Sequence, residues 1–235
     1  MSYEEKKINE AGEVQEPNQY MEEEEEEEVQ GLDEDENHTL TLNFPYLENF
    51  KIDLPRADIG LSMFLVKALE NEDDGDFTLD LNFVLKNGNI EKVKQAIRGV
   101  VHWIKTYKDF VNKENEITPA RPYTNVKTPS MIVFPNGEKV DKTFLDFFSD
   151  ESKVIDDKGL YDESNIDLPF GVFMEETLYG IKIANHLMLK SGLDVLSSFV
   201  ALALKGKHFA EQEAMLKKHF TKDGSVLVLE PKVDV

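Results

Sequence analysis

The 235-residue chain contains no cysteine. Disulfide bonds, thiolate metal ligands and a catalytic thiol are therefore excluded. Its five histidines do not show the HxxxH or HExxH spacing that would indicate a zinc site. Solvated or core-edge histidines are the simpler interpretation, and we expect neither a metal nor a cofactor. The five are His38, His102, His186, His208 and His219.

Long apolar runs are also missing. No stretch of about 18 apolar residues occurs, as a membrane-spanning helix would need, and the N-terminal sequence MSYEEKKINE lacks the apolar core of a signal peptide. These two observations predict a cytoplasmic or nuclear protein that has no membrane partner.

Basic residues are scarce relative to acidic ones. The chain has 26 lysines and arginines against 47 aspartates and glutamates, a net charge of −21. Residues 1–38 contain 16 acidic and 2 basic side chains, among them the run Glu22–Glu28, and we expect this tail to be disordered. It is more simply a solvating tail than a binding site for basic partners such as histones. So acidic a chain is not expected to bind nucleic acid.

Structure is predicted to begin at Thr39. Apolar and polar residues alternate in Thr39–Phe44 and again in Phe50–Leu54, which predicts a half-buried β-hairpin. A helix should follow Pro55, and Phe77–Phe83 alternates as a third strand would. From Ile90 to Ile104 the apolar residues keep a helical period, which indicates an amphipathic helix.

The signal weakens between residues 111 and 167, where four prolines interrupt a polar stretch. We interpret this stretch as a linker or insertion. A small hairpin around Asn136-Gly137 and a short helix at Thr143–Phe148 are predicted within it. Trp103, the single tryptophan, is expected in the core.

The most distinctive stretch is Met174–Lys207. Its apolar spacing predicts two consecutive helices, with the break at Lys190–Gly192 because a basic residue and a glycine often end a helix. The second helix is so apolar that it must be buried or must bind a partner. A further short helix is expected at His208–His219 and a final strand at Val226–Leu229.

No constellation of catalytic residues stands out. The sequence has no Gly-rich phosphate loop, no GxSxG elbow and no paired carboxylate signature, and an abundance of acidic residues is not by itself a catalytic signal. We therefore expect a protein-binding module and not an enzyme.

The residues resemble the Skp family, the adaptors that join F-box proteins to a cullin in ubiquitin ligases. The specific part of the resemblance is Ile183–Leu187, reading IANHL, followed at the family spacing by Lys190, Leu193–Val195 and Lys205–Lys207. The resemblance implies an α/β (α+β) chain with a BTB/POZ fold, in which a small N-terminal sheet packs on helices and C-terminal helices extend the domain. It divides the chain into a tail (1–38), two parts of the BTB/POZ domain (39–110 and 168–190) around the linker (111–167), Skp-type helices (191–220) and a divergent C-terminal tail (221–235).

The resemblance also implies a function and its residues. The chain would be a non-catalytic adaptor of a cullin-RING (SCF-type) ubiquitin ligase, with F-box proteins and a cullin as partners and a possible homodimer. By matched position, the cullin contact falls on Asn185 and His186. The F-box contact falls on the second helix, at Leu193, Leu196, Phe199, Val200, Ala203 and Leu204.

The chain departs from the family pattern at three places. His186 replaces the usual tyrosine, Ser191-Gly192 replaces glycine-leucine, and Val226–Leu229 stands where the family continues with an acidic helical segment closing on a tryptophan. These departures favour an alternative, a divergent BTB-type structural or self-assembling protein that does not engage a cullin.

Overall fold

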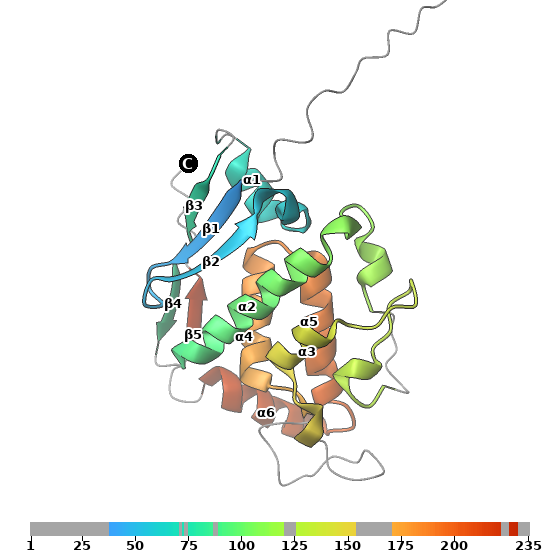
Figure 1. The fold of residues 1–235 in the computed structure, drawn as a ribbon. Coiled ribbons are helices and arrows are strands. Elements are labelled where there is room, and N and C mark those ends of the chain that lie inside the picture. The colour runs from blue at the N-terminus through green and yellow to red at the C-terminus, as the bar shows by residue number, and fades with distance from the viewer. Residues whose placement is uncertain are drawn as a thin grey trace, which may run out of the picture. The chain divides into compact units, whose positions relative to one another are not determined.

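The computed structural model describes residues 38–70, 72, 75–86, 89–119, 126–153, 171–221 and 226–229. Within this part the chain is mixed α/β, as expected, with a small sheet beside a group of helices (Figure 1). All these residues belong to one unit, which spans residues 33–235. The predicted acidic tail lies outside the described residues except for His38.

Three strands form the first sheet, in the order β2-β1-β3. The predicted hairpin is confirmed: β1 (Thr39–Phe44) pairs antiparallel with β2 (Phe50–Pro55). β3 (Phe77–Asp80) pairs parallel with β1. The alternation in β1 buries Leu40, Leu42 and Phe44 on one face, so this face of the sheet contributes to the core.

The connection between β2 and β3 is helical, as a parallel pairing requires. A 3₁₀ helix, η2 (Arg56–Leu61), leads into α1 (Met63–Leu69). Ser62 separates the two and caps α1, because its hydroxyl accepts a hydrogen bond of 3.2 Å from the backbone N–H of Leu65.

The predicted third strand, Phe77–Phe83, is in fact two strands. The extended strand is interrupted at Leu81-Asn82, which belong to no strand. β4 (Phe83–Lys86) then pairs in a separate two-stranded sheet. Its antiparallel partner is β5 (Val226–Leu229), the strand predicted at the end of the chain. Alternation records which faces are buried and carries no information about the partner strand, so the sequence could not show this division.

The amphipathic helix predicted from Ile90 is α2 (Ile90–Thr106), capped by Asn89. It packs against α3 (Lys142–Phe148) and α4 (Met174–His186). Trp103 is fully buried, as predicted, with its ring 4.2 Å from that of Tyr107 and 4.8 Å from that of Phe144 between centroids. The aromatic cluster therefore lies at the junction of α2 and α3.

The stretch from 111 to 153 contributes several residues to the core in the part that the structure describes. Besides α3 it contains three short 3₁₀ helices: η4 (Glu114–Ile117), η5 (Pro129–Met131) and η6 (Glu151–Lys153). A fourth, η3 (Lys108–Phe110), immediately precedes it. The predicted hairpin around Asn136-Gly137 is a turn closed by one antiparallel bridge, between Val133 and Lys139. Seven apolar side chains of the stretch are buried, namely Ile117, Ile132, Phe134, Val140, Phe144, Leu145 and Phe148.

The two helices predicted in Met174–Lys207 are α4 and α5 (Lys190–Ala203), followed by α6 (Phe209–Thr221). The break between the first two lies at Leu187–Leu189 and not at Lys190–Gly192, which corrects the prediction. Met188 adopts the left-handed conformation with φ of 51°. Gly192 lies inside α5 and does not end a helix. Its lack of a side chain allows close packing, since a Cβ there would lie 2.8 Å from Leu189 Cδ2 and 3.4 Å from Trp103 Cδ1.

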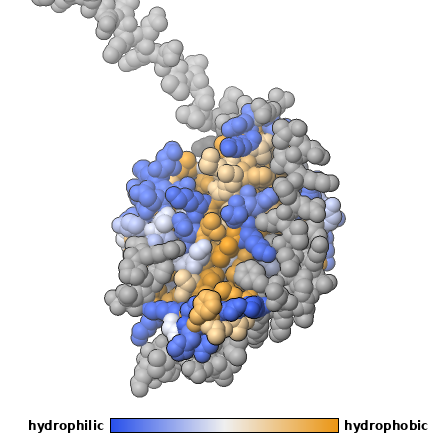
Figure 2. Space-filling view, turned by 180° about the vertical axis from the view of Figure 1, so that it is seen from behind, coloured by the Kyte–Doolittle hydropathy of each residue, from blue (hydrophilic) through white to orange (hydrophobic). Residues whose placement is uncertain are grey.

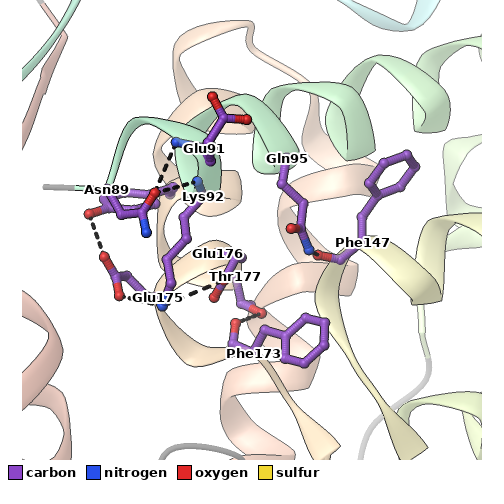
Figure 3. A network of polar contacts seen from close by, with 10 residues as sticks. Asn89, Glu91, Lys92, Gln95, Phe147, Phe173, Glu175, Glu176 and Thr177 are labelled. Carbon is purple, nitrogen blue, oxygen red and sulfur yellow. Dashed lines mark hydrogen bonds and ion pairs between the residues drawn. The ribbon is translucent and has the colours of Figure 1, made fainter. Parts of the chain in front are cut away.

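A polar network joins the first turns of α2 and α4 (Figure 3). Lys92 Nζ lies 2.8 Å from Glu175 Oε2 and 3.6 Å from Glu176 Oε1, and Gln95 donates to the backbone carbonyl of Phe147 on α3. Burial raises the pKa of Glu176. Burial opposes the charge on Lys92, but the hydrogen bonds and charges of Glu175 and Glu176 together outweigh this effect, and the Lys92 pKa is raised. Burial therefore disfavours the charged form of Glu176, whereas the two carboxylates favour the charged form of Lys92.

Candidate functional site

The candidate site is built on the turn between α4 and α5, where the predicted cullin residues lie. Two hydrogen bonds from distant parts of the chain hold this turn. The Ser62 hydroxyl donates to the carbonyl of Leu187 over 2.6 Å, and the backbone N–H of Ser191 donates to Glu114 Oε2 over 2.9 Å. Glu114 therefore supplies the N-terminal cap that α5 lacks locally, since Leu189 offers no side-chain acceptor.

The two predicted cullin residues differ in their surroundings. Asn185 is exposed on α4, whereas His186 is half-buried. The imidazole ring lies 5.0 Å from the ring of Phe64 on α1 and 5.3 Å, edge to face, from that of Phe83 on β4. Burial lowers the pKa of His186, so the neutral ring is favoured. His186 thus packs α4 against two other elements while part of its ring stays accessible.

The six predicted F-box residues fall into two groups. Leu196, Phe199 and Ala203 are fully buried in the chain's own core, so in this conformation no partner can contact them. Leu193, Val200 and Leu204 are half-buried and pack against the edge of that core. Of the six predicted residues, only these last three are therefore available to a partner.

The half-buried residues belong to a larger apolar surface. We define the hairpin face as Ile181 on α4, Leu193 and Val200 on α5, and Leu204 directly after α5, all of which are partly exposed. In Figure 1, α4 and α5 lie behind α2 and α3. Figure 2 views the molecule from the opposite side and shows a band of apolar atoms over this region, bordered by polar ones. Ile181 was not among the predicted binding residues, although the helical spacing places it on the apolar stripe of α4.

The described part of the C-terminus leaves the hairpin face partly open. After Gly206, which has φ of 77°, α6 turns against the end of α5, where the Gln212 amide donates to the carbonyls of Leu204 and Lys207. Met215 is buried there, while Phe209 is 80% exposed. β5 contacts α4.

The described residues also bear on two other kinds of site, a cavity and a metal site. A cavity of about 760 Å³ is lined by Lys142, Asp146 and Glu151 among others, but the Glu151 carboxylate is occupied by Ser130, whose N–H and hydroxyl donate to it over 2.7 and 2.6 Å. Within the described ranges, no three His, Asp or Glu side chains are grouped as a metal site would require.

A separate finding concerns membranes. Where the structure describes the chain, it contains no helix that is both long enough and apolar enough to cross a bilayer.

Comparison with known proteins gives no further identification. The chain matches no model of a known protein family, and a search of curated proteins found no match. What the chain does has therefore to be inferred from the hairpin face and from the α4–α5 turn.

Proposed function

We propose that this chain is an adaptor that binds two proteins at once and catalyses no reaction itself. It would bridge an F-box substrate receptor, bound on the hairpin face, to a cullin scaffold, bound at Asn185 and His186, in an SCF-type ubiquitin ligase. Its fold would be of the BTB/POZ type. Substrate choice would belong to the F-box partner.

The strand order supports the BTB/POZ assignment. A hairpin of β1 and β2, a helical crossover, and β3 parallel to β1 form the small N-terminal sheet that the resemblance implies. α2 follows, and the α4–α5 hairpin packs on it through α4. This is the order of elements expected of that domain with its C-terminal extension.

The observation that carries the proposal is the half-exposed aliphatic row on α5. Leu193, Val200 and Leu204 recur at helical spacing on one side of the helix, where they form the outer edge of the core. Burying the exposed half of each would contribute about 1 kcal/mol, since a fully buried side chain of this kind contributes about 1.5 to 3 kcal/mol. A partner helix with its own apolar stripe fits such a surface.

The position of the two surfaces supports simultaneous binding. Asn185 and His186 lie at the end of α4, next to the turn, whereas the aliphatic row runs along α5 away from it. The Ser62 and Glu114 hydrogen bonds fix the turn between them. One rigid hairpin would therefore hold both partners in a constant relation.

One observation favours the alternative, a BTB-type protein that self-assembles without a cullin. His186 packs on Phe64 and Phe83 within the chain, so part of the proposed cullin contact is already used internally. Light scattering over a range of concentrations distinguishes the two. Self-assembly predicts a mass that rises with concentration, and the adaptor predicts binding to F-box and cullin fragments in place of self-association.

The adaptor is tested by co-expression of the full chain with an F-box fragment and with a cullin N-terminal domain. Val200→Glu with Leu204→Glu should reduce F-box capture at least about tenfold, because a charge would be desolvated in the interface. The same double variant should retain the cullin fragment, and Asn185→Lys should show the reverse pattern. Val133→Glu, at a valine that is 47% exposed on the 133–139 turn, is the control and should keep both partners.

Two outcomes would contradict the proposal. A folded chain that captures neither fragment would exclude the adaptor function. Loss of both partners in the Val200/Leu204 variant, with an unchanged circular dichroism spectrum, would show that the two surfaces are not separate.

A further inference from the structure

The edge of β4 is paired with a strand from the other end of the chain. Phe83–Lys86 pairs antiparallel with Val226–Leu229, in the register Phe83 to Leu229 and Lys86 to Val226. About 140 residues separate the two strands along the sequence. The C-terminal strand therefore occupies a backbone edge that the N-terminal half of the domain presents.

β4 is fixed in place by contacts that do not involve β5. The Phe83 side chain is 1% exposed, and its ring lies 5.3 Å from that of Phe44 on β1 and 5.3 Å from that of His186. Just before it, the N–H of Leu81 donates to the carbonyl of Asn43 over 2.7 Å. Residues of β1 and α4 thus position the start of β4 without any contribution from β5.

The pairing of β4 with β5 is shorter than that of β1 with β2, which extends over six residue pairs. It consists of four residue pairs in a ribbon of only two strands, supported on one side by contacts with α4. Two-stranded ribbons are at best marginally stable by themselves, and short terminal elements open locally at much lower free energy than the core. Because α6 ends at Thr221 and β5 begins at Val226, release of β5 requires no unfolding of α6.

We propose that the β4 edge is a strand-binding site, which β5 occupies within the chain and which accepts an extended aliphatic segment of a partner protein. The chemistry of the ligand is given by β5 itself: Val-Leu-Val-Leu is β-branched and aliphatic at alternate positions, and the backbone hydrogen bonds of the edge do not depend on its side chains. The proposal is independent of the adaptor function, since strand addition to β4 requires neither an F-box protein nor a cullin.

The site also adjoins the proposed cullin contact. Phe83 opens β4 and touches His186, so a strand on the β4 edge lies one side chain away from that histidine. A partner must compete with β5, so its apparent affinity is reduced by the fraction of chains in which β5 is released. Variants that release β5 should therefore bind a strand in trans more tightly.

The test uses the full chain carrying Leu227→Pro with Val228→Pro. One of two consecutive N–H groups in a strand points at its partner, so two prolines remove it whatever the register. A fluorescent peptide of residues 225–235 is the probe, and its anisotropy should show binding to this variant at least about tenfold tighter than to the unmodified chain. Val233→Pro, at a sequence position outside the range Val226–Leu229, is the control and should behave as the unmodified chain.

Two results in this experiment would overturn the proposal. One is equal or absent peptide binding by the double-proline variant when its unfolding remains cooperative. The other is equal binding of a peptide that carries the same two prolines, since strand addition requires the backbone donors.

Hydrogen exchange on the unmodified chain gives an independent test that needs no variant. The amides of β4 and β5 should exchange together, and at least about 100-fold faster than those of β1, because release of β5 is a local opening. Protection in β5 equal to that of β1 would mean that β5 leaves only on global unfolding, and would overturn the proposal.

Discussion

At the scale of single residues, His186 combines an internal packing role with a proposed role in partner binding. It is half-buried between Phe64 and Phe83, which joins α4 to α1 and β4, and it is at the same time one of the two residues proposed to meet a cullin. Desolvation lowers its pKa, which means that the folded chain binds a proton there less readily than the unfolded chain does. The internal contacts of His186 therefore depend on its being neutral.

We expect this histidine to make stability depend on pH. As pH falls below about 6.5, the unfolded chain takes up the proton first, so the free energy of unfolding decreases. Compared with His186→Phe, which fills the same space without titrating, the unmodified chain should lose roughly a few tenths of a kcal/mol between about pH 7.5 and pH 5.5, since the half-solvated ring is screened. Urea denaturation of both proteins at the two pH values measures the difference. A difference that does not change with pH would show that the ring is protonated equally in both states.

At the scale of elements, periodicity predicted most helices and strands but none of the long-range partners. The bounds of β1, α2 and α3 follow from alternation, helical spacing and short turns, because these patterns record which side of an element is buried. The break between α4 and α5 was misplaced because Gly192 looks like a helix end, whereas its small size serves the contact with Trp103. The pairing of β4 with β5 could not be predicted, since nothing local specifies it.

The same limit applies to the candidate site. Helical spacing identified the apolar residues of α5 but did not show which side faces the core, because nearly the whole helix is apolar. Leu196 and Phe199 are buried and Val200 is not. A charge at either buried position would unfold the chain and would not test an interface, whereas a charge at Val200 would do so.

Close packing between helices gives a prediction at this scale. The ring of Phe148 on α3 fits against Gly99 of α2 and Gly180 of α4: a Cβ on Gly99 would overlap the ring, and one on Gly180 would lie 2.8 Å from Phe148 Cε1. Gly99→Ala should therefore lower the free energy of unfolding by about 1 to 3 kcal/mol through overpacking, although alanine favours a helix over glycine by about 1 kcal/mol.

A smaller side chain at residue 148 should relieve this overpacking. Phe148→Leu is destabilising alone, but combined with Gly99→Ala it should cost at least about 0.5 kcal/mol less than the sum of the two changes. Chemical denaturation of the two single variants and the double variant completes the cycle. Strict additivity would mean that the ring does not limit the size of residue 99.

At the scale of the whole molecule, the N-terminal half and the helical hairpin depend on a few polar contacts between residues far apart in the sequence. Ser62 and Leu187 are 125 residues apart, and Glu114 and Ser191 are 77 apart. Ser191 also accepts a hydrogen bond from the Trp103 indole over 3.2 Å. These contacts converge on the α4–α5 turn, so the geometry of the proposed binding surfaces depends on both halves of the chain.

Ser62 is the residue through which this dependence can be measured. Its hydroxyl is fully buried, caps α1 and donates to the carbonyl of Leu187, so Ser62→Ala removes a cap and leaves that carbonyl without this donor. The free energy of unfolding should fall by about 1 to 3 kcal/mol.

Ser149→Ala is the matched control, because Ser149 is also buried but donates only to the carbonyl of Leu145 in the helix that it ends. That carbonyl also accepts from the Ser149 backbone N–H. That control should lose less than about 1 kcal/mol. Equal losses in urea denaturation would mean that the 62–187 contact does not join the two halves, and hydrogen exchange at the α4–α5 turn, accelerated in Ser62→Ala alone, would locate the effect there.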